Sequence, residues 1–297
     1  MPVPSRVIQV AVPRPLHAVY DYRVPETLPM PSVGTRVKVP FARATTVGIC
    51  VSDVVENPHK TLKDVESVLD TSAIVPAELM ALAHWMSNYY HYPLGEILAT
   101  VLPAAARRGA TCSINPPDYW RVCTDTFDNT RARAQAALFN DLQKQGPTAT
   151  TDLLAVGHSR TTLNNLSKGN YIERCEPVDT PAGETPPTPT EAQDTAIRAI
   201  SAALQSFAPF LLEGVTGSGK TEVYLRSIAP VVAQGRQVLV LVPEIALTPQ
   251  TLSRFQRRFA NVGMLHSNLG DSARLQTWLK CARGDISVLI GTRSAVF

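Results

Sequence analysis

The segment that most constrains this chain is a phosphate-binding pattern that follows a short apolar run. Phe210–Leu212 is apolar, and Gly214–Thr221 reads G-x-x-x-x-G-K-T. A strand, a glycine-rich loop and a helix start in this order form the loop that cradles nucleotide phosphates. The pattern therefore predicts an α/β nucleotide-binding fold in which Phe210–Leu212 is a strand and Glu222–Ala233 continues the helix.

Each residue type in this loop has its own task. Glycines allow backbone conformations that a Cβ would block, so successive N–H groups can converge on phosphate oxygens. Lys220 supplies a positive charge for the β- and γ-phosphates, and Thr221 supplies a hydroxyl ligand for Mg²⁺. We therefore predict Lys220 and Thr221 as catalytic residues, Thr221 as the Mg²⁺ ligand, and a nucleotide-binding set of Gly214, Val215, Thr216, Gly217, Ser218, Gly219, Lys220 and Thr221.

The composition is that of a folded chain without export or membrane signals. Hydrophobic residues make up 44% and charged residues 18% of the 297 residues, enough to bury real cores. Met1–Arg6 lacks the apolar segment of a signal peptide, and no stretch approaches the length of a membrane span. We expect a soluble, cytoplasmic protein with no membrane partner, built from two domains or a few small ones.

Cysteine spacing and charge add weaker constraints. The five cysteines are scattered without a C-x-x-C pair, so we expect reduced thiols and no zinc site in this chain. The net charge is only +3, but residues 251–297 hold seven Lys or Arg against two Asp, a local charge of +5. That region could face phosphates or be an ordinary solvated helix face, and composition leaves both open.

Residues 1–110 begin with period-two alternation, the pattern of half-buried strands. Short strands are predicted over 7–12, 20–24, 34–41 and 47–51, and their Pro and Gly punctuation suggests a small β-barrel. Residues 77–92 have helical spacing. This helix carries four aromatic residues that we expect to pack against the barrel, with stacking on bases as the alternative: Trp85, Tyr89, Tyr90 and Tyr92.

Residues 111–178 have a helical period. Helices are predicted over 131–144, 151–156 and 159–168, the last capped by Ser159, and 169–175 resembles a turn and a β-wing. Three helices and a wing are the winged-helix pattern, which serves in DNA contact or in protein contact. Residues 179–189 are a proline-rich linker.

Residues 190–297 alternate between apolar strands and helices. Strands over 238–243, 262–266 and 286–290 are separated by helices over 249–259 and 271–283, and another helix opens at Thr190. This alternation predicts a parallel sheet with helices on both faces. The whole chain is therefore a multidomain α+β and α/β protein.

Several sequence blocks carry a resemblance that is more specific than the phosphate loop. In the C-terminal part they read GVTGSGKTEVY from Gly214, VPEIALTPQ from Val242, LHS from Leu265 and GTRSAVF from Gly291. In the N-terminal part they read YDY from Tyr20, VKVPF from Val37 and YYHYPLGE from Tyr89. Together they resemble the primosomal protein N′ family, the bacterial replication restart helicases of superfamily 2, over essentially the whole chain.

The resemblance implies a function, cofactors and partners. Family members use ATP and Mg²⁺ to move 3′→5′ on single-stranded DNA and recognise abandoned replication forks by structure. They then reload the replicative helicase through partner proteins. The implied partners are forked and single-stranded DNA, primosome proteins and single-stranded-DNA-binding protein.

The resemblance also implies a pocket for the terminal nucleotide of a nascent strand. Tyr20 would stack on the terminal base, Asp21 would accept a hydrogen bond from the 3′-hydroxyl, and Lys63 would meet a phosphate. Ala42 stands where the family usually has glycine, and its methyl would tighten the pocket or shift the backbone. Without the resemblance, Lys63 is equally a solvated loop lysine and Asp21 a turn-capping carboxylate.

In the C-terminal part, Gln193 matches the family glutamine that reads adenine, although alone it would be an ordinary helix residue. Sequence-independent contact with the DNA backbone is implied for five residues in two blocks: Glu244, Thr248, Gln250, Thr292 and Arg293.

Some family elements are not found in this sequence. There is no acidic Walker B block, no second motor lobe and no zinc-binding cysteine cluster, although zinc belongs to the full-length family. We therefore expect an N-terminal helicase portion that binds fork DNA and ATP without unwinding, with an exposed apolar edge near Val288–Val296. Two alternatives stay open: an unrelated P-loop NTPase such as a small-molecule kinase, and a non-catalytic DNA-end-binding module.

Overall fold

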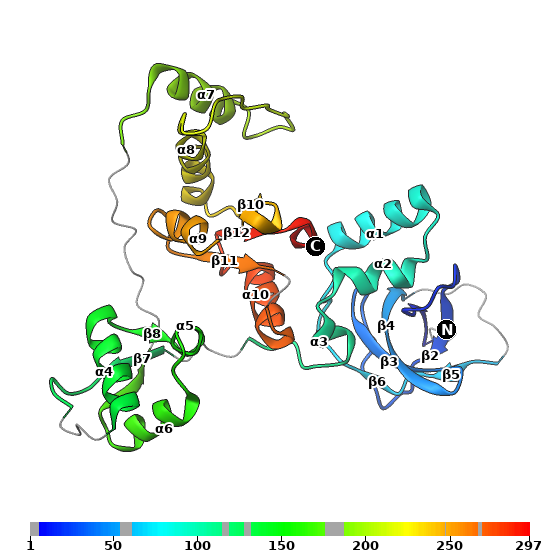
Figure 1. Cartoon of the computed structure of the whole chain (residues 1–297). Helices are drawn as coiled ribbons and strands as arrows, with labels where there is room; N and C mark the ends of the chain where they lie inside the picture. Colours follow the sequence, from blue (N-terminus) through cyan, green and yellow to red (C-terminus); the bar gives the residue numbers. More distant parts are fainter. Residues whose placement is uncertain are drawn as a thin grey trace. The chain divides into compact units, whose positions relative to one another are not determined.

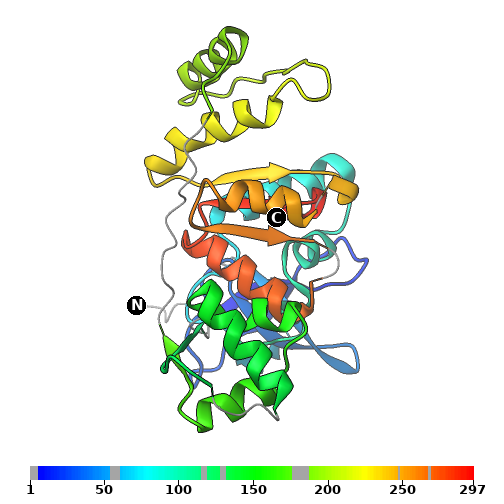
Figure 2. The same ribbon diagram turned by 60° about the vertical axis from the view of Figure 1, so that its left-hand side comes forward.

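The computed structural model describes residues 6–53, 61–114, 119–127, 132–175, 187–246, 248–266 and 269–297. These residues form two compact units (Figures 1 and 2). One consists of Met1–Ile114 with Glu184–Phe297, and the other of Asn115–Gly183. The linker prediction over 179–189 lies outside the described residues except for 187–189.

A six-stranded sheet forms the N-terminal part of the first unit. Its strands are β1 (Val7–Ala11), β2 (Tyr20–Arg23), β3 (Arg36–Phe41), β4 (Ala44–Ser52), β5 (Lys63–Asp64) and β6 (Ser67–Val68). The order is β5-β2-β1-β4-β3-β6, with only β2 and β5 parallel. The sheet curls (Figure 1) and encloses an apolar core that includes Ile8, Val10, Val37 and Val39. The four strands predicted from alternation are thus confirmed.

Three helices accompany this sheet: α1 (Ala77–Tyr90), α2 (Leu94–Val101) and α3 (Ala104–Arg107). Helix α2 packs so closely on β1 that a Cβ built at Gly95 would lie 1.7 Å from the Val12 carbonyl oxygen. A glycine is therefore required where the helix meets this strand end. The sequence prediction recognised α1 but not α2 or α3.

The four aromatic residues of the α1 region do not pack against the sheet. Trp85, Tyr89, Tyr90 and Tyr92 are all at least half exposed, from 51% to 65%. The Trp85 and Tyr89 rings stack on one another with centroids 4.9 Å apart, one helical turn apart in sequence. The expectation that they pack against the barrel is wrong, because the residues that α1 buries are Met80 and Ala83 instead.

The fully buried Arg36 of β3 connects the sheet to the segment at the end of α3. Its guanidinium donates to both carboxylate oxygens of Asp70, at 2.9 and 2.6 Å, and to the carbonyl oxygens of Ala106 and Ala110. A buried charge is tolerated only when it is paired and hydrogen-bonded, and here the partners satisfy that condition.

The second unit combines a small sheet with three helices. Its elements are β7 (Tyr119–Val122), α4 (Arg133–Gln145), β8 (Thr148–Ala149), α5 (Thr150–Ala155), α6 (Arg160–Lys168) and β9 (Ile172–Cys175). The antiparallel sheet has the order β8-β7-β9, and its core includes Trp120, Phe139 and Leu166. The hydroxyl of Ser159 accepts a hydrogen bond from the Thr162 N–H, so the predicted N-cap of α6 is confirmed.

The C-terminal part of the first unit is a parallel sheet covered by helices. Its elements are α7 (Glu191–Ala202), α8 (Lys220–Ala233), β10 (Val238–Leu241), the 3-10 turn η1 (Glu244–Ala246), α9 (Pro249–Gln256), β11 (Val262–Leu265), α10 (Asp271–Arg283), β12 (Val288–Gly291) and η2 (Arg293–Val296). The order β10-β12-β11 is parallel throughout. Residues of α8 and α9 pack with Val288 and Ile290, whereas Leu289 packs with Cys281 of α10. Helices therefore cover both faces, as predicted.

Two predictions for this region are wrong. Phe210–Leu212 does not form a strand, and Leu211 is 85% exposed. Residues Val288–Gly291 form the central strand and are buried, so the predicted exposed edge is not there, although Val296 within the predicted range is 45% exposed. The edge that carries exposed apolar side chains is β10, where Leu239 and Leu241 are each more than two-fifths exposed.

Within the described residues, no helix is both long and apolar enough to cross a membrane. The same part of the chain contains no group of His, Cys, Asp and Glu side chains that could hold a metal ion, and its five cysteines are free.

Candidate nucleotide and DNA sites

The phosphate loop connects directly to the N-terminus of α8, with Gly219 as the N-cap residue. Gly217 and Gly219 have φ values of +84° and +81°, a region that side chains disfavour. A Cβ at Gly214 would lie 2.6 Å from the Ser218 hydroxyl. The backbone therefore favours glycine at 217 and 219, and at 214 a side chain would meet that of Ser218. The helix start beside this loop is a site that favours anions.

The two residues predicted to be catalytic begin α8. The Lys220 ammonium donates to the carbonyl oxygens of Gly214 and Val215, at 2.5 and 3.0 Å. The Lys220 side chain thus folds back onto the phosphate loop, and phosphate oxygens could replace these two carbonyl oxygens as acceptors. Lys220 and Thr221 are half-buried, and both line a cavity of about 910 Å³ together with Thr216, Gly217 and Gly219.

Gln193 lies in α7, before the phosphate loop in the chain, and its side chain contacts the loop. Its side-chain oxygen accepts from the Thr190 N–H at 3.0 Å, and its amide nitrogen donates to the Ser218 carbonyl at 2.9 Å. The Thr190 hydroxyl in turn accepts from the Gln193 N–H, which completes a capping box. The amide is thus engaged in holding α7 against the loop, beside the cavity that would receive a nucleotide.

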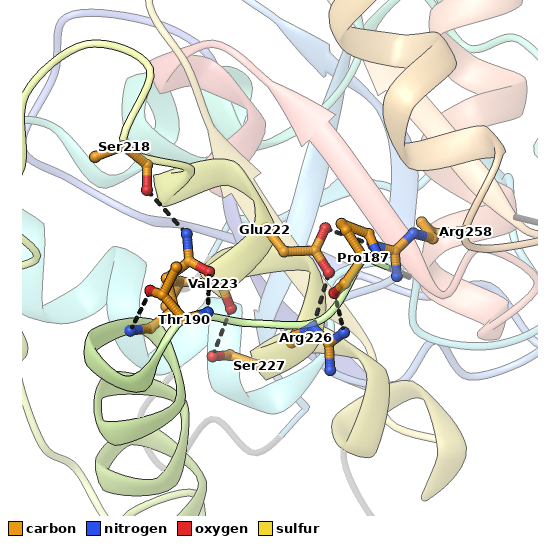
Figure 3. Close-up of polar contacts among 9 residues, drawn as sticks. Pro187, Thr190, Ser218, Glu222, Val223, Arg226, Ser227 and Arg258 are labelled. Carbon is orange, nitrogen blue, oxygen red and sulfur yellow. Dashed lines mark hydrogen bonds and ion pairs between the residues drawn. The ribbon is translucent and has the colours of Figure 1, made fainter. Parts of the chain in front are cut away.

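An acidic residue and two arginines stand beside the loop, and sequence reasoning missed them as a group. Glu222 accepts from Arg226 at 2.8 Å and from Arg258 at 2.5 Å (Figure 3). Arg226 also donates to the Pro187 carbonyl, and Arg258 lines the cavity with Arg254. The basic composition of 251–297 was a signal for this cluster, but nothing local pointed to Glu222.

The predicted backbone-contact residues gather at one edge of the parallel sheet. Glu244 and Thr248 follow β10, and Thr292 and Arg293 follow β12. Because parallel strands present their carboxyl ends at the same edge, these residues converge there, where open α/β sheets bind ligands. The Thr248 hydroxyl caps α9 by accepting from the Thr251 N–H, and Gln250 is exposed in its first turn.

The two threonines and Arg293 differ in exposure. Thr292 is buried, with only 6% of its surface exposed, whereas Arg293 is exposed and Thr248 half-buried. Arg274 of α10 donates to the Ser294 hydroxyl at 3.1 Å, which holds η2 against α10. Any contact with a DNA phosphate near Thr292 would therefore use the exposed neighbours or the backbone.

Of the residues predicted to form the 3′-end pocket, Tyr20, Asp21 and Lys63 lie on the neighbouring strands β2 and β5, whereas Ala42 lies in the turn between β3 and β4. The Tyr20 ring packs edge-to-face on Phe41, with centroids 5.0 Å apart, and Phe41 precedes Ala42. Asp21 accepts from the Gln9 amide at 3.2 Å. Lys63 is exposed on β5, in register with Tyr22 on β2. The structure thus brings Tyr20 close to the Ala42 turn and places Lys63 one strand away from Tyr20 and Asp21.

Ala42 adopts a backbone conformation that is unusual for alanine. Phe41 pairs with Ala44, so Ala42 and Arg43 form a two-residue turn between β3 and β4. Ala42 has a φ of +52°, and Arg43 is not among the described residues with positive φ. Such a turn favours glycine at its first central position. The structure thus gives a backbone reason for the glycine that the resemblance leads us to expect there.

The charges around Lys63 are locally balanced. Arg23 forms a bidentate hydrogen-bonded pair with Asp64, the residue after Lys63. The hydrogen bond from Arg23 lowers the pKa of the Asp64 carboxyl. The carboxylate next to Lys63 in the chain is therefore paired with Arg23.

Comparison with known proteins identifies both ends of the chain. A family model described as the 3′ DNA-binding domain matches residues 9–103, and a DEAD/DEAH box helicase model matches residues 190–297. The helicase match implies nucleotide and Mg²⁺ use in general terms, and the loop at Gly214–Thr221 lies within it.

Curated relatives match almost the entire chain. The replication restart protein PriA of Haemophilus influenzae is 34% identical over 98% of this chain and 42% of its own length. PriA of Chlamydia trachomatis is 35% identical over 97% of this chain, and PriA of Bacillus subtilis is 28% identical over 94% of it. The chain spans about two-fifths of the length of these relatives, in their N-terminal portion. This chain therefore belongs to the replication restart protein PriA family.

Proposed function

We propose that this chain is the N-terminal portion of an ATP-dependent 3′→5′ DNA helicase that recognises abandoned replication forks and restarts replication by primosome assembly. The observation that carries this proposal is the presence of a 3′ DNA-binding domain match and a helicase match in one chain. In this proposal the portion described here binds fork DNA and a nucleotide.

Nucleotide binding rests on the loop before α8. The glycine conformations leave the loop N–H groups free of Cβ obstruction, and the residues at Gly214–Thr221 fit a nucleotide triphosphate and its metal. In this proposal Lys220 would bind the β- and γ-phosphates in place of its two carbonyl acceptors, Thr221 would hold Mg²⁺, and Gln193 of α7 would recognise the adenine. Bound Mg²⁺ would neutralise charge on the phosphates.

DNA binding rests on two groups of residues. Tyr20, Asp21, Ala42 and Lys63 form a pocket for a 3′-terminal nucleotide, supported by the packing of Tyr20 on Phe41 near the Ala42 turn. A second group follows the DNA backbone at the carboxyl edge of the parallel sheet: Glu244, Thr248, Gln250, Thr292 and Arg293. Neither group reads base sequence, which suits recognition of forks by structure.

The finer architecture belongs to the same proposal. We assign the curled sheet to a barrel-like DNA-end-binding domain over 1–110 and the second unit to a winged-helix domain over 111–178. The antiparallel order β8-β7-β9 and the helices α4–α6 support the latter. Primosome proteins and single-stranded-DNA-binding protein are the proposed partners, in the cytoplasm.

The first test compares two DNA ends. A fluorescent partial duplex ending in a 3′-hydroxyl is titrated against the same duplex ending in a 3′-phosphate, at one fixed salt concentration. Because backbone charge contributes equally or favours the phosphate, tighter binding of the hydroxyl end would support the pocket at Tyr20 and Asp21. Equal affinity would mean that only phosphate electrostatics are read, and end recognition would be withdrawn.

One alternative function has an observation in its favour. Phe210–Leu212 stays outside the sheet, which is compatible with a DNA-end-binding module whose phosphate loop no longer works. Equilibrium binding of a fluorescent ATP analogue with Mg²⁺ separates the two. If the helicase proposal holds, the chain binds the analogue and Lys220→Ala weakens this by at least about tenfold, because a charge-assisted contact with phosphate is lost. Absence of binding in the unmodified chain would favour the module.

A further inference from the structure

The ion pair between Glu222 and Arg258 joins the phosphate loop to the segment that carries the proposed DNA contacts. Glu222 is two residues after Lys220 in the first turn of α8, and Arg258 is two residues beyond the end of α9. The two residues are 36 positions apart in the chain. Their side chains are only 15% and 12% exposed, so solvent screens this pair much less than it screens the exposed Arg198–Asp194 pair of α7.

The contacts of α9 connect the η1 turn to helix α8. At its start, Thr248 caps the helix, and the Thr251 hydroxyl donates to the Ala246 carbonyl of η1 at 2.9 Å. Toward its end, Phe255 is buried in the same core as Leu225 and Ile228 of α8. A displacement of the η1–α9 segment by a DNA strand would therefore reach α8 through this core and through Arg258.

Glu222 links this path to the nucleotide site, because it lines the same cavity as Lys220 and Thr221. Its carboxylate accepts from two guanidinium groups, that of Arg226 in its own helix and that of Arg258 in the segment that follows α9 (Figure 3). Arg226 alone would form an ordinary i,i+4 pair, which is worth only a few tenths of a kcal/mol on a helix. Arg258, which is 36 residues away in the chain, therefore links the orientation of Lys220 and Thr221 to the position of α9.

We propose that Glu222 and Arg258 are positioning residues that couple DNA binding on the η1–α9 segment to nucleotide binding at the phosphate loop. This inference rests on the proposed function, because it takes the nucleotide site and the DNA contacts near Glu244 and Thr248 as given. The pair holds the first turn of α8 in the arrangement that receives phosphates when DNA fixes α9. Neither residue is required to touch the DNA.

The test measures a coupling ratio on the full chain. The dissociation constant of a fluorescent, non-hydrolysable ATP analogue with Mg²⁺ is determined with and without saturating short oligothymidylate. We expect DNA to tighten nucleotide binding at least about fivefold, and the nucleotide to tighten DNA binding by the same factor, because coupling between two ligands is reciprocal. In Glu222→Gln and Arg258→Gln we expect this ratio to fall close to one.

Two further variants distinguish coupling from simple stabilisation. Arg258→Lys keeps the charge and should restore part of the ratio. Arg254→Gln removes a cavity-lining arginine one turn earlier, for which the described residues contain no hydrogen-bond or ion-pair partner. It should shift the nucleotide affinity equally with and without DNA and leave the ratio intact. Glu222→Gln is nearly isosteric, so it decides the question if Arg258→Gln does not fold.

The outcomes separate this inference from the function on which it rests. Nucleotide and DNA binding without any mutual effect would overturn the coupling and leave the proposed function standing. An unchanged ratio in Glu222→Gln, with or without a lower melting temperature, would assign the pair a structural role only. No nucleotide binding in the unmodified chain would overturn both.

Discussion

The curled sheet and the phosphate-loop segment have similarly apolar sequences but different environments. In the sheet, β1 lies between β2 and β4, and its residues Ile8 and Val10 are completely buried. Phe210–Leu212 is equally apolar, yet it pairs with no strand and leaves Leu211 85% exposed. The difference shows that an apolar run becomes a strand only where a neighbouring edge accepts its hydrogen bonds, because unpaired backbone groups cannot be buried.

The largest expected contrast between these regions is in thiol reactivity. Cys50 on β4 is fully buried, and burial raises its pKa to about 12. Since the thiolate is the reactive form, at pH 8 we expect Cys50 to be labelled at least about 10³-fold more slowly than in the unfolded chain. Cys281 on α10 is only partly buried and should react sooner. Timed labelling with mass spectrometry of each site checks this.

The same pKa gives a pH dependence with a definite sign. The folded state holds the Cys50 proton more tightly than the unfolded chain, whose thiol has the ordinary value of 9.0. Its contribution to stability is therefore complete below pH 9 and is lost as the pH rises toward 12. A Cys50→Ala variant serves as the control, and it should lose less stability between these pH values. Rapid labelling of Cys50 at pH 8 would contradict the closed core.

The next largest effect is the loss of stability expected when the buried guanidinium of Arg36 is removed. Replacing Arg36 by Met leaves Asp70 without its guanidinium partner and removes two hydrogen bonds to the Ala106 and Ala110 carbonyls. Loss of one member of a buried ion pair typically costs about 3–5 kcal/mol. Native-state hydrogen exchange of the β3 and β4 amides should report this loss. Arg23→Met, which breaks an exposed pair with Asp64, is the matched control and should have almost no effect.

A pair of identical substitutions tests the comparison directly. Leu98 of α2 is 1% exposed, so Leu98→Ala should cost about 2–5 kcal/mol through lost burial and a cavity. Leu211→Ala should stay within about 0.5 kcal/mol, because an exposed side chain loses little on truncation. Urea unfolding of both variants followed by tryptophan fluorescence measures the difference. A large cost for Leu211→Ala would mean that the phosphate-loop segment is packed in solution.

The sequence predicted those features that are set by local pattern. Alternation located β1–β4, helical spacing located α1 and α8–α10, and two glycines of the loop, Gly217 and Gly219, have the positive φ values that their chemistry suggests. The pocket residues and backbone contacts came from family resemblance and remain predictions. The exposed side of α1 was misjudged because aromatic residues at helical spacing are compatible with either a buried or an exposed face.

Features that depend on distant residues were beyond the sequence. The Glu222–Arg258 pair spans 36 positions, and no periodicity links its members. The short helix α2 was missed because an eight-residue apolar segment is too short to separate helix from strand by period alone. The failure of Phe210–Leu212 to pair depends on which sheet edge is available, a property of the whole fold.

The smallest predicted change in stability is at Ala42, a non-glycine residue with a backbone conformation that favours glycine. Ala42 occupies the left-handed region with a φ of +52°, which costs a non-glycine residue about 1 kcal/mol or more. Ala42→Gly removes that strain but adds conformational freedom to the unfolded chain, worth about 0.4–1 kcal/mol in the opposite direction. We therefore expect a net stabilisation of about 0.5 kcal/mol, measured as a small rise in the melting temperature.

The control for this substitution is Ala44→Gly, two residues later in β4, where glycine relieves no strain and should destabilise the strand. Equal destabilisation by both substitutions would show that the turn is not strained. The proposed 3′-end pocket adds a second readout, because Tyr20 packs on Phe41 directly before the turn. If the Ala42 methyl obstructs the terminal nucleotide, Ala42→Gly should also strengthen the preference for a 3′-hydroxyl end. An unchanged preference with a raised melting temperature would confine the role of Ala42 to the backbone of the hairpin.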